Sequence, residues 1–353
     1  MKSFSLGSYA LSGGAAAALL TGCSGLRSET STTNAIPDTT TVVGYADRGT
    51  TSMKPGSSSG DLLYVPDFGG DMYVFSYPGG DLVATFEVGN TVSGLCSDSE
   101  GDVFVTSPNA NGMGGFIYEY THGGTSPAAT LIDPYPYSDD WPSGCSRDPV
   151  TGNLAVVDPG KASEGGYSGD VMIYPNAQGV PTPYTDADIV QYTSAAYDNN
   201  GNLFVDGYGA YNSYPTRYAE LPAGSGIFTD ITLNEALPSP EYLQWDGKYL
   251  LIQNVKYGDR QFLISQVQLS GSSGTVVKTI SFNKWTVHGG QPAIQGDTMV
   301  APTGVASGKH IGFWKYPKGG KPELILKNFA DGKHDGLIGA AISLAPSDLR
   351  IRK

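Results

Sequence analysis

Hydrophobic and polar residues alternate in short runs along the chain, and one of these runs repeats. Asp198–Gly207, DNNGNLFVDG, is a glycine-centred turn followed by a short apolar segment. An Asn-Gly or Asp-Gly pair between β-forming runs predicts a tight hairpin, because Gly and Asn adopt positive φ at little cost. Units of this kind recur roughly every 40 to 50 residues, which predicts a repeat architecture. The six copies are Ser59–Asp67, Glu100–Ser107, Thr151–Asp158, Asn200–Gly207, Asp246–Gln253 and Gln295–Pro302.

Further strand patterns accompany these turns. Each hairpin continues into an alternating segment that ends in Tyr or Leu before another glycine-bearing turn: Met72–Gly80, Phe116–Gly124, Val171–Gly179, Arg217–Gly224, Ile264–Gly274 and Ile311–Gly320. A third segment follows in five copies: Leu82–Val88, Ala128–Ile132, Phe228–Leu233, Thr275–Phe282 and Pro322–Asn328. Segments rich in small residues precede the turns: Ser93–Asp98, Ser143–Asp148, Thr193–Asp198, Glu241–Asp246 and Gly290–Gln295. Four antiparallel strands in each of six units predict an all-β, six-bladed β-propeller with the small-residue strands at its axis.

The first hairpin has no such inner segment in front of it, and the last blade is followed by a spare one. Gly336–Pro346, GLIGAAISLAP, has the pattern of an inner strand without its own blade. We expect it to join the first blade and close the ring, because closure removes exposed strand edges. The predicted propeller spans residues 59–347, and a basic tail follows at 348–353.

The N-terminal residues have the pattern of a signal for export. A single Lys2 precedes an apolar run that ends at Leu20 and is too short to cross a membrane. Leu20–Cys23, LTGC, resembles the lipobox of bacterial lipoproteins. That resemblance implies cleavage after residue 22, lipid on Cys23, and anchoring to a membrane facing the periplasm or the cell exterior. The alternative is an ordinary secretory signal with an unrelated cysteine.

Residues 23–58 are rich in Ser, Thr and Gly, and we predict a flexible tether. Within it, Thr40–Tyr45 is a candidate for an additional strand of the propeller.

The charge of the chain narrows the choice of partners. Its 353 residues carry a formal net charge of −13, with a pI near 4.6. Such acidity argues against nucleic acid as a partner, which needs a basic patch, and against electrostatic docking on anionic lipid. We expect a soluble surface and a monomer.

The recurring pattern Asp-x-x-Gly-Asn-Leu-[Tyr/Phe]-Val resembles NHL-repeat propellers and the related SMP-30/gluconolactonase-like proteins. The resemblance covers roughly Ser59 to Pro346. It implies the propeller fold, which hosts enzymes, scaffolds and ligand-binding proteins alike. Enzymes of the SMP-30 type bind a metal through Glu, Asn and Asp in the channel, but no set of positions in this chain matches that pattern.

We expect a binding site where loops enter the inner strands, around one mouth of the channel. The candidate binding residues are Asp139, Asp140, Trp141, Asp188, Glu241 and Trp285. His288, His334 and Asp335 are the candidate ligands of a divalent cation, because two imidazoles and nearby carboxylates suit one. Aromatic residues in or near the loops suit a carbohydrate or a peptide: Tyr135, Tyr137, Trp141, Tyr208, Tyr211, Tyr214 and Trp285. By contrast, Tyr77, Tyr120, Tyr174 and Tyr316 recur with the strand register and are predicted to belong to the blade framework.

Two functions remain open. The chain has no Gly-x-Ser-x-Gly elbow, P-loop or Cys-x-x-Cys motif. We therefore favour a non-catalytic binding or scaffold module of the cell envelope, with a protein or carbohydrate ligand. The alternative is a metal-dependent hydrolase or lyase at the channel mouth.

Cys96 and Cys145 lie on inner strands of adjacent predicted blades. An exported protein can keep a disulfide between them. Cys96 stands two residues before Asp98, whereas Cys145 stands three before Asp148. Such an offset turns one side chain to the opposite face, although a longer turn after Asp148 makes the register ambiguous. The sequence therefore leaves two alternatives for Cys96 and Cys145, a disulfide or two buried thiols.

Overall fold

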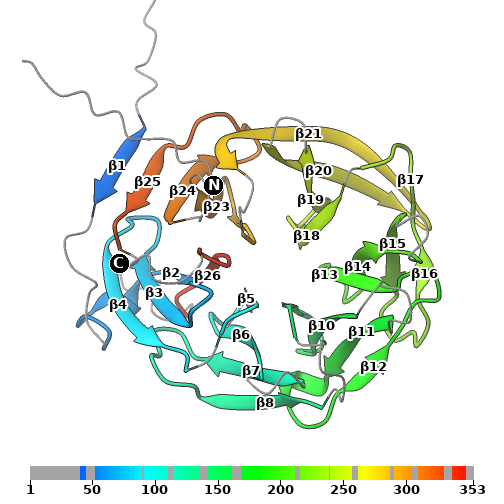
Figure 1. The fold of residues 1–353 in the computed structure, drawn as a ribbon, viewed down its shortest axis with the longest axis horizontal. Coiled ribbons are helices and arrows are strands. Elements are labelled where there is room, and N and C mark those ends of the chain that lie inside the picture. The colour runs from blue at the N-terminus through cyan, green and yellow to red at the C-terminus, as the bar shows by residue number, and fades with distance from the viewer. Residues whose placement is uncertain are drawn as a thin grey trace, which may run out of the picture. The chain divides into compact units, whose positions relative to one another are not determined.

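The computed structural model describes residues 40–44, 52–89, 91–109, 114–134, 142–160, 168–210, 215–237, 239–256, 261–286, 290–303, 309–329 and 336–346. They form six β-sheets that radiate from a central axis within the compact unit Thr39–Lys353 (Figure 1). The predicted six-bladed β-propeller is confirmed. The described part of the chain holds no helix with the length and apolar character needed to cross a membrane.

Strand order within the blades runs outward from the axis. Blade one is β26 (Ala341–Ser343), β2 (Leu62–Pro66), β3 (Asp71–Ser76) and β4 (Leu82–Glu87). Blade two is β5 (Gly94–Ser97), β6 (Val103–Pro108), β7 (Gly115–Tyr120) and β8 (Ala129–Asp133). Blade three is β9 (Gly144–Arg147), β10 (Leu154–Gly160), β11 (Ser168–Tyr174) and β12 (Thr182–Tyr184), the last of which the sequence pattern missed.

The other three blades follow the same order. Blade four is β13 (Gln191–Tyr197), β14 (Leu203–Tyr208), β15 (Thr216–Leu221) and β16 (Thr229–Asp230). Blade five is β18 (Pro240–Trp245), β19 (Leu250–Lys256), β20 (Gln261–Ser270) and β21 (Ser273–Thr286), with β17 (Thr232–Leu233) on its edge. Blade six is β22 (Ala293–Gln295), β23 (Thr298–Thr303), β24 (His310–Lys315) and β25 (Leu324–Lys327), with β1 (Thr41–Gly44) on its edge. Two short 3-10 turns, η1 (Ser57–Ser59) and η2 (Pro175–Ala177), complete the described elements.

The turn aspartate explains why the hairpin unit repeats. Asp198 Oδ1 accepts hydrogen bonds from the backbone N–H groups of Asn200 and Asn202, at 2.8 and 2.9 Å. Gly201 sits between them with φ of 82°, a conformation that residues with a Cβ rarely adopt. The carboxylate therefore satisfies turn amides that would otherwise be left without a partner. Asp98, Asp148 and Asp246 make equivalent bonds in their own turns.

The hydrophobic core is divided among the six boundaries between blades. Each boundary holds one cluster of buried side chains, such as the cluster that joins Val74 and Val83 of blade one to Val103 and Val105 of blade two. The recurring tyrosines belong to this framework, as predicted: Tyr120, Tyr174 and Tyr316 are buried in such clusters, and Tyr77 packs against one.

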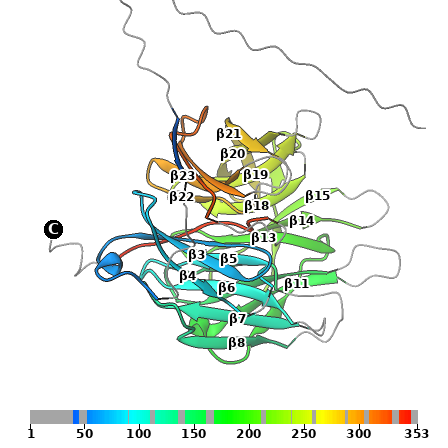
Figure 2. The ribbon, with the colours of Figure 1, turned by 60° about the vertical axis from the view of Figure 1, so that its left-hand side comes forward.

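Both ends of the propeller take part in closing the ring. The C-terminal strand β26 pairs antiparallel with β2, with Ile342 opposite Leu63, which confirms the predicted closure. At the other end, β1 adds to the outer edge of blade six, parallel to β25, with Thr41 opposite Leu324 (Figure 1 and Figure 2). The additional strand considered for Thr40–Tyr45 is therefore present. Lys54 N also donates to Val83 O at 3.0 Å, so contacts with the propeller begin ahead of the boundary predicted at Ser59.

Blades four and five share one connecting segment. The third segment predicted for blade four, Phe228–Leu233, is split between the two sheets. Thr229 and Asp230 pair with β15 of blade four, whereas Thr232 and Leu233 pair parallel with β21 of blade five. The strand β17 therefore covers the outer edge of blade five, and the outer strand of blade four, β16, is correspondingly short.

We predict that deleting residues 336–353 abolishes cooperative folding. Deletion removes β26, which leaves β2 as an open edge at the axis and uncovers the cluster around Ile342. Thermal unfolding and size-exclusion chromatography would show an aggregated or non-cooperative product. Deleting only residues 347–353 retains β26 and is the matched control. A sharp, unchanged melting transition in the longer deletion would contradict the role of closure.

Candidate functional site

A cavity of about 570 Å³ lies at one end of the channel, and all six inner strands contribute to it. Its lining comes from the last residues of these strands and from the glycine turns that follow them. We call this end the turn face. The opposite end, at which the chain enters the inner strands, is the loop face. The sequence predicted a site at the loop face, whereas the cavity of the described residues opens at the turn face.

Position in the repeat explains the chemistry of the lining. The residue immediately before each turn aspartate lines the cavity, and its identity changes from blade to blade: Ser97, Arg147, Tyr197 and Trp245. In blades two to five, the Asp and the Gly that follow this residue are required by the turn. The lining also includes Leu95, Ala196, Leu243, Ala340 and Ile342, whose side chains are buried in the clusters between blades. The repeat thus keeps its framework constant and leaves one variable position per blade facing the cavity.

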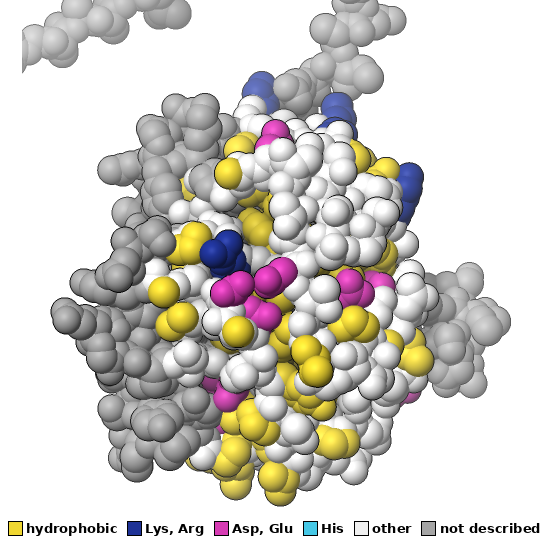
Figure 3. All heavy atoms as spheres, turned by 90° about the vertical axis from the view of Figure 1, so that its right-hand side faces the viewer, with side chains coloured by type: hydrophobic (Ala, Val, Ile, Leu, Met, Phe, Trp, Pro, Cys, Tyr) yellow, Lys and Arg dark blue, Asp and Glu magenta, His cyan; other side chains and the backbone are white. Residues whose placement is uncertain are grey.

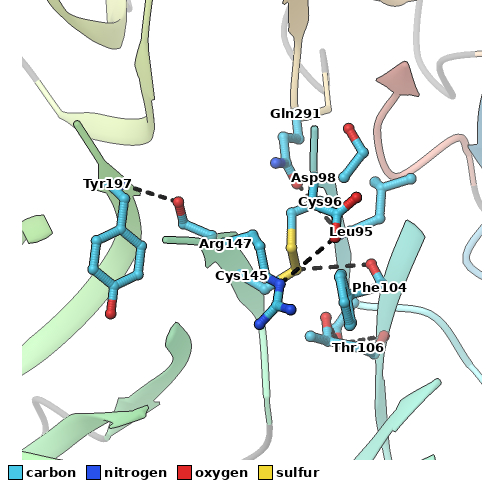
Figure 4. The surroundings of a disulfide bond; sticks show 12 residues. Leu95, Cys96, Asp98, Phe104, Thr106, Cys145, Arg147, Tyr197 and Gln291 are labelled. Carbon is cyan, nitrogen blue, oxygen red and sulfur yellow. Dashed lines mark hydrogen bonds and ion pairs between the residues drawn. A yellow bond between two sulfur atoms is a disulfide. The ribbon is translucent and has the colours of Figure 1, made fainter. Parts of the chain in front are cut away.

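A disulfide joins Cys96 of β5 to Cys145 of β9 across the boundary between blades two and three (Figure 4). Their Cα atoms are 5.5 Å apart. The second turn is one residue longer, because Asp98 N bonds to Asp102 O and Asp148 N bonds to Asn153 O, but this does not move the cysteines relative to their aspartates. The one-residue offset between the cysteines therefore persists in the structure. It favours the bond, because neighbouring blades meet through opposite faces of their sheets: Cys145 faces Phe104 of blade two, and Cys96 faces blade three. Of the two alternatives open for these cysteines, the structure has the disulfide.

Among the described residues that line the cavity, Arg147 is the one cation. Its guanidinium Nε lies 3.6 Å from Asp98 Oδ2, and its Cζ lies 5.6 Å from the centre of the Phe104 ring (Figure 4). Both ionic side chains are largely buried, at 15% and 7% exposure. An Arg stacked on an aromatic ring and paired with one carboxylate has little freedom to move.

Hydrogen bonds and the disulfide connect the inner strands around the cavity. Ser97 Oγ donates to Ile342 O at 2.8 Å, which links blade two to blade one. Ser146 Oγ accepts from Tyr197 N at 3.0 Å and Ser194 Oγ from Leu243 N at 2.9 Å, which link blades three, four and five.

Blades five and six are linked at two points. Gln244 Nε2 donates to Ile294 O at 2.9 Å, and Gln244 Oε1 accepts from Ile294 N at 3.1 Å. Backbone bonds between Gln291 and the segment Ile338–Ala340 complete the circle to blade one. Every boundary between neighbouring inner strands therefore carries at least one direct cross-link.

Most of the residues predicted at the loop face lie outside the described residues. These are Asp139, Asp140, Trp141, His288, His334 and Asp335, together with Cys23 of the lipobox. Of the aromatic candidates, Tyr208 ends β14. Trp285 was placed in a loop, whereas its backbone lies near the end of β21, because β20 and β21 form a hairpin much longer than the others.

The structure places Asp188 in the connection between blades three and four. Asp230 of β16, the outermost strand of blade four, interacts directly with Asp188, and Asp186 and Arg217 are also close. On this flank of the ring a group of acidic side chains lies beside a basic one (Figure 3). The connection to β13 starts at the outer edge of blade three, so its first residues lie far from the axis. Asp188 thus lies beside β16 of blade four, and its role at the mouth stays a prediction.

Glu241 does lie at the loop end of an inner strand, beside a buried carboxyl that the sequence analysis missed. Glu241 is the unpaired residue of a bulge in β18, and burial raises its pKa to about 7. Asp206 of β14 is completely buried and accepts a hydrogen bond from Thr193 Oγ1 at 2.6 Å. Burial, and then the charge of Glu241, raise the pKa of Asp206 to about 7 as well. The sequence signal that could have identified Asp206 is its position in an apolar strand pattern, LFVDG.

One group of metal-ligating type occurs among the described residues, and it is at the turn face. Oxygen atoms of Asp98, Glu100 and Asp102 lie within 4.8 Å of one another. Asp98 Oδ1 is occupied by two turn amides and Asp98 Oδ2 faces Arg147. The group therefore belongs to the rim of the cavity already described.

Comparison with solved structures identifies the fold. A protein of unknown function from Bacteroides caccae matches with a TM-score of 0.50 and 13% identity, over 79% of this chain and 98% of its own. TolB from Acinetobacter baumannii matches with a TM-score of 0.52 and 11% identity, over 82% of this chain and 68% of its own. At such identities the likeness shows the propeller fold alone. No protein-family model and no curated protein sequence matches the chain.

We predict that Asp206→Asn raises stability strongly at pH 8 and much less at pH 5. An unfolded Asp has a pKa near 3.9, whereas the folded value is about 7. Between these values the folded state holds more protons than the unfolded state, so stability falls as pH rises toward 7 and is lowest above it. The cost reaches up to about 4 kcal/mol for Asp206.

Denaturant unfolding from pH 5 to 9 would measure this effect. Asp297→Asn is the control, because the Asp297 carboxylate is exposed and its hydrogen bond to Lys315 lowers its pKa. If Asp206→Asn destabilised the protein equally at both pH values, the buried carboxylate would not be the source of a pH dependence.

Proposed function

We propose that the protein is a binding or scaffold module of the cell envelope that holds its ligand in the turn-face cavity. The observation that carries the proposal is the cavity itself, to which all six inner strands contribute. Its variable positions come from four different blades, which is how a repeat fold builds a specific surface on a constant framework. Its direct cross-links hold the lining in place before a ligand arrives, which lowers the cost of binding.

We further propose that the chain is exported and anchored through lipid on Cys23, and that it is a distant relative of the NHL/SMP-30-like propellers. The apolar run before Cys23 and the disulfide between Cys96 and Cys145 support export, since disulfides persist in oxidising compartments. The repeated Asp–Gly turn supports the family relationship.

A metal-dependent hydrolase or lyase at the loop face is the second candidate. Asp206 and Glu241 favour it, because carboxyl groups with a pKa near 7 suit proton transfer at neutral pH. In this alternative His288, His334 and Asp335 would hold a divalent cation.

Filling the cavity tests the binding function. We predict that Gln295→Trp, which adds an indole at the cavity rim, abolishes ligand binding while leaving the melting temperature within a few degrees of the wild type. Gln178→Trp, at an exposed turn of blade three outside the cavity lining, is the matched control. The measurement is a thermal-shift screen of sugars, peptides, amines and carboxylates with both variants. A ligand that binds equally well to Gln295→Trp would place the site elsewhere, and loss on chelation would favour the loop-face enzyme.

Lipid attachment is tested at Cys23. In a bacterial expression host, we predict that the wild type incorporates an alkyne-labelled fatty acid and partitions into detergent, and that Cys23→Ala incorporates none. Cys96→Ser is the control and should label as the wild type does. Incorporation that survives Cys23→Ala would rule out this anchor, whatever the fractionation shows.

A further inference from the structure

The outer edge of blade four is left partly open by its short outer strand. The strand β16 pairs with β15 over two residue pairs, and Ile231 N adds one hydrogen bond to Tyr218 O at 2.8 Å. The chain then leaves this edge, and its next strand, β17, pairs with β21 of blade five. Within the described part of the chain, no strand lies opposite Thr216 on the outer side of β15.

The backbone of Thr216 presents its hydrogen-bonding groups to this open edge. Successive residues of an antiparallel strand direct these groups to alternate sides, so residues two apart face the same neighbour. Tyr218 O faces outward, because Ile231 N donates to it, whereas Pro215 O faces inward, because Gly209 N donates to it at 2.8 Å. Thr216 therefore offers one N–H and one C=O on the outer side, which is where an extended segment can add as a strand.

A cavity of about 470 Å³ lies along this open part of the edge. One wall is formed by Thr216, Arg217 and Tyr218 of β15, and the other by residues of the segment 230–237 that crosses to blade five. The edge is therefore a hollow between two parts of the chain and not a flat surface.

Two other outer edges of this propeller carry an added strand. The strand β1 pairs with β25 of blade six, and β17 pairs with β21 of blade five, both in the parallel direction (Figure 1). Each added strand comes from a part of the chain outside the blade that it extends. The circumference of the ring thus accepts further strands, and the edge of blade four has an open position of the same kind.

The charges around the cavity select the kind of segment that fits it. Asp230 and Glu235 line the cavity, and Arg217 is the one cation among its described lining residues. Asp186 and Asp188 lie close to Asp230, because their charges, after burial, raise its pKa, whereas Arg217 lowers it. Four carboxyl groups thus accompany one guanidinium at this edge, which favours a segment that carries Lys or Arg. A second copy of the chain, with its net charge of −13, is a poor match.

We propose that the open edge of β15 binds an extended, basic segment of a partner polypeptide, which adds to blade four as a strand. Backbone hydrogen bonds to Thr216 hold the segment, and its Lys or Arg side chains pair with Asp230 and Glu235. The inference goes beyond the ligand proposed for the turn-face cavity, because the two cavities share no lining residue.

A displayed library of random decapeptides, panned on the purified full chain, supplies the probes for a test. Enriched peptides are synthesised with a fluorophore and titrated by fluorescence polarisation. We expect Lys or Arg alternating with Val, Ile or Thr, and weaker binding at higher ionic strength. N-methylation of the central residues of a peptide removes its backbone donors and should weaken binding at least tenfold.

Variants of the chain locate the bound segment. Thr216→Pro removes the outward N–H, which an edge strand tolerates, and should weaken binding at least tenfold. Thr216→Val keeps this N–H and is the matched control, which should bind as the wild type does. Glu235→Lys should also weaken binding at least tenfold, whereas Glu87→Lys, at an exposed position on the outer strand of blade one, should not. We expect all four variants to melt within a few degrees of the wild type.

Several results would overturn the proposal. These are the enrichment of no peptide, the enrichment of acidic peptides, and binding that withstands both Thr216→Pro and N-methylation. Loss in Glu235→Lys alone would mean that the peptide binds by charge without joining the sheet. Peptides lost in Gln295→Trp but not in Thr216→Pro would bind the turn-face cavity, which would support the proposed binding function while strand addition fails. If Thr216→Pro lowers the melting temperature, the N-methylated peptides test the same hydrogen bonds.

Discussion

The pairing of β26 with β2 is the constraint on which the rest of the propeller depends. The two strands come from opposite ends of the described chain and share only three residue pairs. No blade has a core of its own, because the buried clusters lie between blades. Each blade is therefore stable only when both neighbours are present, and the first and sixth blades become neighbours only through closure. The strand β1 strengthens the same junction from outside, since it carries the N-terminal segment onto blade six.

The repeated motif is used for the fold, which is why it says little about function. In the turns of blades two to five the Asp carboxylate satisfies backbone amides and the Gly takes a positive φ. In these four turns both residues serve the backbone, whatever the protein binds. The side chain just before the Asp does not stabilise the turn, and it changes from Ser to Arg to Tyr to Trp around the cavity. In a chain built from repeats, the position at which the copies disagree is more informative about binding than the motif they share.

The fold could be predicted because alternation and turn chemistry are local, whereas the site depends on contacts that are not. Alternating segments with Asp–Gly turns were sufficient to place six blades and the closing strand. The exchange of Thr232 and Leu233 into blade five depends on which sheet edge is vacant, and no local pattern records that. Likewise, the one-residue offset between Cys96 and Cys145 turns them toward one another because neighbouring blades meet through opposite faces of their sheets, and only the arrangement of the blades reveals this. The place of Asp188 beside Asp230 could not be predicted either, because a connection between blades runs from periphery to axis and no local pattern marks where along it a residue stands.

The two ends of the channel meet the problem of buried charge in different ways. At the loop face Asp206 is completely buried, and its hydrogen bonds from Thr193 Oγ1 and from backbone N–H groups do not offset the desolvation of a carboxylate. At the turn face Asp98 is largely buried as well, but two turn amides and Arg147 stabilise its charge. A charged Asp98 therefore has the partners that a charged Asp206 lacks. A carboxyl kept at such a cost is ready to gain or lose a proton near neutral pH, so the loop face is the end at which proton chemistry would be found if the protein has any.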